Sequence, residues 1–309
     1  MRSYTWEYDQ EGSWGRVIHH SFVLNLEIPQ KLHSYYIGLE RLPTADYSLY
    51  VTHTADDKFI GAVAAELGDM AVEKDFDLQE TVDFVASFVQ GLKYISETDE
   101  EGEYPKYPLQ TLVDKGGDCE DTSILLVSLL QLMNHKVILL SFPSQSEGEP
   151  GHMGTGVNGN FSGKYYSYEG IDYYYLETTG KGCRVGEMND DYEEVQAQIY
   201  NPEPTPLLKF FGAYKWEMVE ALIGSDRDVK LYMEVRNWGT ATAEDIYIRA
   251  SYDEWQYWAK SDNFDLEIDH QVSNIQIELT VPEEHNILKV QLSHGTIIAD
   301  EAEIDLGQV

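Results

Sequence analysis

A cysteine set among acidic residues is the strongest chemical signal in this sequence. Cys119 stands in the run Gly-Gly-Asp-Cys-Glu-Asp-Thr-Ser at positions 116–123, and a strongly apolar segment follows from Ile124 to Met133. A segment that is apolar nearly all round predicts a helix buried on most sides. The dipole and the unpaired N–H groups of a helix N-terminus favour a thiolate. The run therefore predicts a nucleophilic thiol, against the alternative of a small buried cysteine without chemistry.

Three carboxylates flank this thiol and oppose its ionisation, so they need another role. If Asp118 is the N-cap of the helix, Asp121 falls at the third helical position and can complete a capping box. The other interpretation is that Asp118, Glu120 and Asp121 help to hold Ca²⁺, whose oxygen ligands are often clustered carboxylates. The residues alone leave both alternatives open.

A thiol catalyst also needs a base and a group that orients the base, and these lie apart in sequence. His152 lies between glycines at the start of a predicted strand, and Glu177 lies on a later predicted strand from Tyr173 to Thr178. A cysteine at a helix start with a histidine and an acid on adjacent strands predicts a catalytic triad. His135 is the competing base, but it falls in a predicted turn between helix and strand, where an exposed capping role is simpler.

Six ordered segments between about residues 6 and 200 resemble the transglutaminase-like (papain-like) superfamily. They are 88–90, 104–108, 111–113, 116–122, 151–153 and 175–179. The chain most resembles archaeal transglutaminase-like proteins and bacterial transglutaminase-like cysteine peptidases. The resemblance implies Cys119 as the nucleophile, His152 as the base and Glu177 as the acid, acting on amide or ester carbonyls through an acyl-enzyme.

The acid is where the sequence departs from the superfamily, which commonly has an aspartate followed by Pro-Thr. Here Glu177 is followed by two threonines, and Asp172 is the alternative acid. Glu177 is favoured by its position in the motif, because the orienting role demands geometry rather than a given carboxylate.

An oxyanion hole would need the Cys119 backbone N–H and one further donor. Gln90, on the helix before the motif, is the candidate, although a structural glutamine explains it equally well. The bacterial peptidases with a similar acidic run resemble this chain further in needing calcium, which favours calcium at Asp118, Glu120 and Asp121. The chemistry itself requires no cofactor.

The elements around these residues predict an α+β domain. Helices are expected over Phe59–Val72 and Leu78–Tyr94, the second with Asp77 as its N-cap, because apolar residues recur at helical spacing. A buried strand is expected over Val137–Leu140, with further, antiparallel strands after it. The segment Trp6–Val51 shows no sustained helical period and predicts irregular structure with short strands.

A second domain is predicted after the linker Asn201–Pro206, in which three prolines block helix and ladder pairing. Beyond it, short alternating segments such as Lys230–Val235 predict strands and resemble an immunoglobulin-like sandwich. We therefore expect a papain-like domain of helices packed on an antiparallel sheet at residues 1–205 and an all-β sandwich at 206–309.

Composition restricts the partners of the protein. The net charge is −34, from 55 acidic and 21 basic residues, which argues against nucleic acid and against an anionic membrane surface. No apolar run is long enough for a membrane span and the N-terminus lacks the core of a signal peptide, so the chain as written is expected to be soluble. A removed leader would be invisible, and the acidity suits an extracytoplasmic surface.

Only two cysteines occur, so a Cys119–Cys183 disulfide is the one bridge available, and it would mask the thiol.

These observations predict thiol-dependent amide chemistry on a protein or peptide substrate. Water as the acyl acceptor gives a cysteine peptidase or amidase, which the prokaryotic resemblance favours, and an amine gives a transglutaminase. The alternative from another class is a non-enzymatic adhesion or scaffold module that keeps the papain-like fold.

Overall fold

The computed structural model describes residues 1–41, 46–96, 104–144, 151–188, 192, 195–219 and 226–307. The chain divides into two compact units, Met1–Glu203 and Pro204–Val309. The division falls two residues before the predicted boundary of 205/206, within the proline-rich linker.

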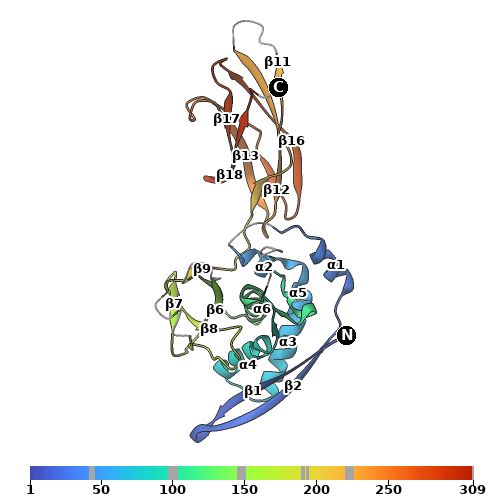
Figure 1. Cartoon of the computed structure of the whole chain (residues 1–309), viewed down its shortest axis with the longest axis vertical. Helices are drawn as coiled ribbons and strands as arrows, with labels where there is room; N and C mark the ends of the chain where they lie inside the picture. Colours follow the sequence, from blue (N-terminus) through green and yellow to red (C-terminus); the bar gives the residue numbers. More distant parts are fainter. Residues whose placement is uncertain are drawn as a thin grey trace. The chain divides into compact units, whose positions relative to one another are not determined.

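Helices of the first unit surround one central helix, α6 (Cys119–Leu132), as Figure 1 shows. α6 contacts the other helices α2 (Ser48–Thr52), α3 (Asp57–Glu73), α4 (Leu78–Gln90) and α5 (Pro108–Asp114), and α1 (Gln30–Gly38) packs on α5. Every residue of α6 from Glu120 to Leu130 is buried, as its uniformly apolar sequence predicts. The predicted helices at 59–72 and 78–94 correspond to α3 and α4, but α4 ends four residues earlier than predicted and Lys93–Tyr94 form a short strand. Two short 3-10 turns, η1 (Ser13–Gly15) and η2 (Thr54–Asp56), complete the helical elements.

The N-terminus of α4 shows how local chemistry fixes an element that later supports the site. The Asp77 carboxylate accepts from the Glu80 N–H at 2.9 Å, and the Glu80 carboxylate accepts from the Asp77 N–H at 2.9 Å. This reciprocal pair is a capping box. The predicted N-cap is therefore confirmed.

A five-stranded antiparallel sheet packs against α6 and supplies the other side of the site. Its strand order is β7-β8-β6-β5-β9. The strands are β5 (Val137–Phe142), β6 (His152–Asn158), β7 (Tyr165–Tyr168), β8 (Ile171–Leu176) and β9 (Gln198–Tyr200). β6 and β8 are neighbours, with Thr155 opposite Leu176, so the start of β6 and the end of β8 meet at one edge.

The first twenty-six residues form a long β-hairpin, which the sequence did not predict. β1 (Arg2–Gly12) pairs with β2 (Arg16–Leu26) over eleven residue pairs, and its tip projects away from the helices (Figure 1). Alternate residues are buried against α4, among them Trp6, whose ring meets Phe88 edge-on at 5.0 Å. The expectation of irregular structure with short strands over Trp6–Val51 was therefore wrong.

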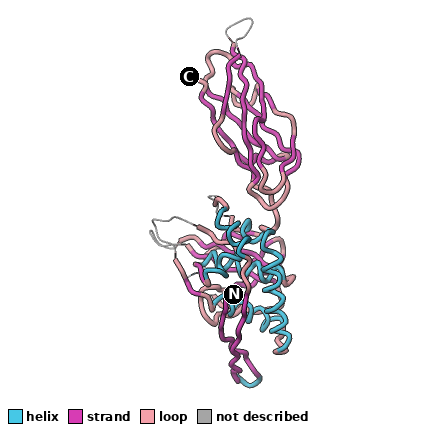
Figure 2. Tube along the Cα trace, turned by 90° about the vertical axis from the view of Figure 1, so that its right-hand side faces the viewer, coloured by secondary structure: helices cyan, strands magenta, loops and turns pink. Residues whose placement is uncertain are grey.

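The second unit consists of strands without helices among its described residues, in contrast to the first (Figure 2). One sheet joins β10 (Leu208–Phe210), β11 (Lys215–Val219) and β16 (Gln271–Val281) to the central β12 (Arg227–Asn237). The other joins β13 (Ala243–Ser251), β14 (Trp258–Lys260), β15 (Phe264–Leu266), β17 (Ile287–His294) and β18 (Ile297–Asp305). All pairs are antiparallel, and both sheets bury side chains in one apolar core.

The coarse fold class is thus as expected: helices with antiparallel sheets, followed by a two-sheet all-β unit. Among the described residues, no helix has the length and apolar character needed to cross a membrane.

Candidate active site

Two glycines bring the chain into α6 through a space that admits no side chain. β4 (Gly116–Gly117) pairs in parallel with β3 (Lys93–Tyr94). A Cβ atom at Gly116 would lie 2.2 Å from the Lys93 carbonyl oxygen, and one at Gly117 would lie 2.3 Å from the Asp121 Cβ atom. Both distances are far below normal contact, so the glycines are needed to place Cys119 at the first position of the helix.

The acidic residues around Cys119 are arranged differently from the predicted capping box. Asp118 is the N-cap by position, but its side chain makes no capping hydrogen bond to the helix. The other half of the predicted box is present, because the Asp121 carboxylate accepts from the Asp118 backbone N–H. Asp121 accepts from the Lys106 backbone N–H at 2.7 Å and pairs with the Lys106 Nζ atom at 2.9 Å. Burial alone would lower the pKa of Lys106, but the charge and hydrogen bond of Asp121 raise it, so the two groups form an ion pair. The carboxylate of Asp121 therefore anchors the segment before α5 to the cysteine helix.

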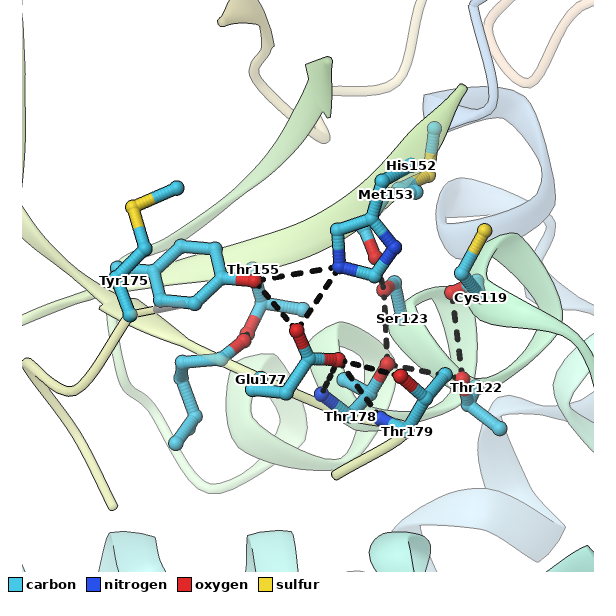
Figure 3. Close-up of polar contacts among 12 residues, drawn as sticks. Cys119, Thr122, Ser123, His152, Met153, Thr155, Tyr175, Glu177, Thr178 and Thr179 are labelled. Atoms are coloured by element: carbon cyan, nitrogen blue, oxygen red, sulfur yellow. Dashed lines mark hydrogen bonds and ion pairs between the residues drawn. The ribbon is translucent and has the colours of Figure 1, made fainter. Parts of the chain in front are cut away.

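Hydroxyl groups join the first turn of α6 to the strands that carry the histidine and the acid. The Thr122 Oγ1 atom lies 2.9 Å from the Thr178 Oγ1 atom. The Ser123 hydroxyl donates to the Met153 carbonyl at 3.2 Å. These contacts fix the cysteine helix against the residues that follow His152 and Glu177, from segments far apart in sequence (Figure 3).

His152 and Glu177 meet at the shared edge of β6 and β8. The His152 Nε2 atom lies 2.9 Å from the Glu177 Oε2 atom and 3.3 Å from the Tyr175 hydroxyl. The Tyr175 hydroxyl donates to the same Glu177 oxygen at 2.7 Å. The structure thus brings together the predicted base and acid, and it adds a tyrosine to the pair.

The second oxygen of Glu177 is held as firmly as the first. Glu177 Oε1 accepts from the Thr178 N–H, the Thr179 N–H and the Thr179 hydroxyl, each at 2.8 Å. Burial would raise the pKa of Glu177, but the hydrogen bond and charge of His152, with the Thr179 N–H and the Tyr175 hydroxyl, lower it to about 2. The carboxylate is therefore ionised and fixed in orientation.

The imidazole ring lies among aromatic rings with one nitrogen directed toward the thiol side. His152 stacks on Tyr192 at a centroid distance of 5.0 Å and on Phe142 at 6.2 Å. Glu177 and Tyr175 both contact Nε2, and the other ring nitrogen, Nδ1, points to the side on which Cys119 lies (Figure 3). The arrangement leaves Nδ1 as the nitrogen that can receive the thiol proton.

The pKa of the Cys119 thiol is raised in this conformation, contrary to the prediction that the helix dipole depresses it. Burial raises the pKa of Cys119, and the neighbouring Glu120 carboxylate raises it further, while the Met153 backbone hydrogen bond lowers it. The Cys119 Sγ atom donates to the Glu120 Oε2 atom at 3.3 Å. Burial and an adjacent anion therefore outweigh the helix N-terminus at this position.

Gln90 was the candidate oxyanion donor, and its contacts contradict that role. Its Nε2 atom donates to the backbone carbonyls of Glu177 at 2.8 Å and Cys183 at 2.9 Å, and its Oε1 atom accepts from the Gly182 N–H at 3.0 Å. Both amide hydrogens are used by carbonyl groups, so none is directed at a reacting carbonyl. Gln90 instead holds the backbone of the acid and the loop after it.

Asp172, the alternative acid, lies at the far end of β8 from Glu177. It is exposed and accepts from the Ser167 hydroxyl at 2.5 Å within the β7–β8 hairpin. The alternative is therefore wrong. His135 lies in the turn after α6, as expected, and burial lowers its pKa.

The two cysteines are free thiols, so the Cys119–Cys183 bridge is not formed. Within the described ranges, no three or more histidine, cysteine, aspartate or glutamate side chains are grouped as metal ligands. Asp121 forms an ion pair with Lys106, and Glu120 accepts a hydrogen bond from the Cys119 thiol. Calcium at Asp118, Glu120 and Asp121 stays a prediction that rests on the resemblance alone.

The sequence interpretation overlooked Tyr94 and Tyr175 as members of the site. Tyr94 lies opposite Gly117 in the short β3–β4 ladder. Burial raises the pKa of Tyr94, and its interactions with Cys119, Asp118 and Glu120 raise it further. Tyr175 was identifiable, because a residue two positions before Glu177 on a strand points to the same face.

No family model matches this sequence, and a search of curated proteins finds no relative.

Proposed function

We propose that the first unit is a cysteine-dependent amide hydrolase of the transglutaminase-like (papain-like) type, a peptidase or amidase that acts on protein or peptide substrates. The observation that carries the proposal is the Glu177 carboxylate. It is held by five donors, and one of them is His152, whose other ring nitrogen points to the side on which Cys119 lies. A buried anion that fixes a histidine beside a helix-N-terminal cysteine is the arrangement that nucleophilic catalysis requires.

The proposed reaction uses no cofactor. The His152 Nδ1 atom takes the proton from Cys119, and the sulfur bonds to the substrate carbonyl carbon. The C–N bond breaks as His152 gives the proton to the leaving amine, which leaves a thioester. His152 then takes a proton from water, and the water oxygen bonds to the acyl carbon. The C–S bond breaks as His152 returns the proton to the sulfur, which releases a carboxylic acid and restores the thiol.

Charge on the carbonyl oxygen needs two aimed donors. The Cys119 backbone N–H is one, and we assign the second to the Tyr94 hydroxyl in place of Gln90. Its support is the register of Tyr94 opposite Gly117 and its proximity to Cys119.

One contact favours a second candidate function, a binding module without catalysis. The Cys119 proton is directed at Glu120 rather than at His152, and the pKa of the thiol is raised. In the enzyme, rotation about the Cα–Cβ bond of Cys119 must turn the sulfur toward His152 when substrate arrives. In a binding module this rotation never occurs.

The test is a pair of assays on one set of variants. A quenched fluorescent peptide library reports cleavage, and a fluorescent primary amine with a glutamine-bearing protein reports amine transfer. Cys119→Ala should abolish the cleavage that the full chain shows, and the matched control Cys183→Ala, which removes the other free thiol, should retain it.

Amine incorporation that exceeds cleavage would replace hydrolysis by a transglutaminase reaction. If neither assay shows Cys119-dependent turnover at any pH from 5 to 9, the binding module is the better description.

A further inference from the structure

We infer that the free edge of β1 is a docking site for an extended, basic polypeptide segment, which would add a third strand to the N-terminal hairpin. Within the part of the chain that the structure describes, β1 and β2 form a sheet of two strands only. The inference concerns binding and is independent of the proposed chemistry.

The contacts of two carbonyl groups show which edge of β1 is open. The Asp9 carbonyl accepts from the Arg184 Nη2 atom at 2.9 Å, and the Ser3 carbonyl accepts from the Lys115 Nζ atom at 2.6 Å. Both donors come from outside the hairpin. In an antiparallel ladder, residues two apart direct their N–H and C=O groups to the same edge. Thr5 and Glu7, which lie between Ser3 and Asp9, therefore present their backbone groups at this edge as well.

Side-chain cations cap the two ends of the edge and leave its middle open. No described residue donates to or accepts from the outward backbone groups of Thr5 and Glu7. Uncapped edge groups form a template for another strand, and proteins usually cover or charge such edges. Here side-chain cations cover only the two ends of the segment.

A groove of about 790 Å³ runs beside this segment and provides room for an occupant. Residues 5–9 of β1 line it together with Val17 and residues 21–23 of β2, and the loop from Lys181 to Arg184 with part of α4 lines it as well. The volume is within the range of natural ligand sites. An extended peptide in this groove would gain main-chain hydrogen bonds from β1, which is the mode of strand addition.

The charge on the groove defines the chemistry of the occupant. The exposed side chains of Glu7 and Asp9 stand on the outward face of β1, beside the row that an added strand would occupy. The Asp9 carboxylate already bonds the His19 Nδ1 atom at 2.6 Å, so Glu7 carries the negative charge that an added strand would meet. Of the two cations that line the groove, Arg184 is already paired with Glu11 at 3.2 Å and Lys181 lies on the loop across the groove. Opposite charges on neighbouring strands stabilise a pair, so lysine or arginine at alternate positions of the peptide is favoured.

The experiment uses an acetylated, fluorescein-labelled heptapeptide of alternating lysine and valine with the full chain carrying Cys119→Ala, so that no turnover occurs. Fluorescence anisotropy should show saturable binding. Glu7→Pro deletes an outward N–H without touching the ladder and should weaken binding about tenfold or more. Asn25→Pro is the matched control, because Asn25 pairs with Ser3, its N–H points to the opposite edge of the hairpin, and it does not line the groove.

Two further measurements keep the test independent of any folding defect. The same heptapeptide N-methylated at alternate residues should bind the unchanged protein about tenfold more weakly, because it cannot donate to the edge. Bound peptide should also slow iodoacetamide labelling of Cys183, which lines the groove.

Equal affinity of Glu7→Pro and Asn25→Pro, or no saturable binding, would overturn the inference. Peptide-independent self-association that Glu7→Pro abolishes would overturn it too, because the occupant would then be a second copy of the chain.

Discussion

The proposed active site of the first unit and the core of the second are both buried, but different forces order them. Around Glu177, five donors fix the direction of the two carboxylate oxygens. In the core of the second unit, Leu231 and Met233 have no solvent exposure and belong to an apolar cluster, so shape and volume order them. Hydrogen bonds determine the orientation of polar side chains, whereas packing determines which apolar side chains fit the space in a core. Substitutions should therefore affect chemistry in one region and stability in the other.

The largest effect is expected from His152→Ala. Loss of the proposed base should lower kcat/KM by about 10³-fold or more, as for other members of catalytic triads. His135→Ala, which removes the competing histidine from the turn after α6, is the control and should leave kcat/KM near that of the unmodified chain. The cleavage assay measures kcat/KM for both variants. Equal losses of kcat/KM in the two would contradict the assignment of His152 as the base.

Leu231→Ala should show the opposite behaviour. Leu231 is fully buried between the two sheets, so truncation leaves a cavity and should lower the free energy of unfolding of the second unit by about 3 kcal/mol. Activity of the first unit should persist below the unfolding transition. Urea unfolding followed by tryptophan fluorescence measures the change.

Lys230→Ala, the neighbouring position on the same strand, is the control and should cause a much smaller loss. A comparable loss at both positions would mean that packing at Leu231 is not what orders this core.

Asp83→Asn tests a buried polar group outside the site. Burial raises the pKa of Asp83 to about 6, above its ordinary value of 3.8. The folded chain therefore holds this proton between pH 4 and 6 while the unfolded chain has lost it. The stabilising contribution is complete below pH 4 and is lost as the pH rises through 6, by about 2 kcal/mol.

In Asp83→Asn this fall should vanish, because the amide cannot ionise and its oxygen can still accept from the Val185 N–H. Urea unfolding of both chains at pH 4 and pH 7 gives the double difference. A difference between the two chains that is the same at both pH values would contradict the prediction.

Tyr175→Phe should have the smallest effect. It deletes one of five donors to Glu177 and leaves the His152 contact, so we expect a loss of about 1 kcal/mol, or up to tenfold in kcat. Tyr165→Phe, on the exposed edge strand β7, is a matched control. Steady-state kinetics would show an unchanged kcat for Tyr175→Phe if the remaining donors suffice to orient the base.

Features that depend on residues close together in the sequence were predictable from it. The Asp77 cap and the apolar period of α4 are local, and both are present. The meeting of His152 and Glu177 also followed from local signals, because each lies at the end of a strand and the two strands are neighbours. The order of helices before strands and the position of the linker could also be predicted from local sequence patterns.

Features that depend on contacts across the chain could not be predicted. Gln90 is polar on an otherwise apolar stripe, and only the fold shows that the backbone around Glu177 and Cys183 consumes its amide. The thiol pKa depends on how deeply the helix start is buried. The hairpin was missed because its buried positions are spread over two segments whose pairing becomes visible only in the structure.

The crowded carboxylate of Glu177 has a consequence for where protons can rest. With two contacts on one oxygen and three on the other, Glu177 has no vacant position at which to accept an additional hydrogen. A proton that leaves Cys119 would therefore stop at the imidazole, and the carboxylate would act as a fixed counter-charge. The proposed chemistry should therefore transfer a single proton in its transition state. A linear dependence of the turnover rate on the D₂O fraction, measured in mixtures of H₂O and D₂O, would show this.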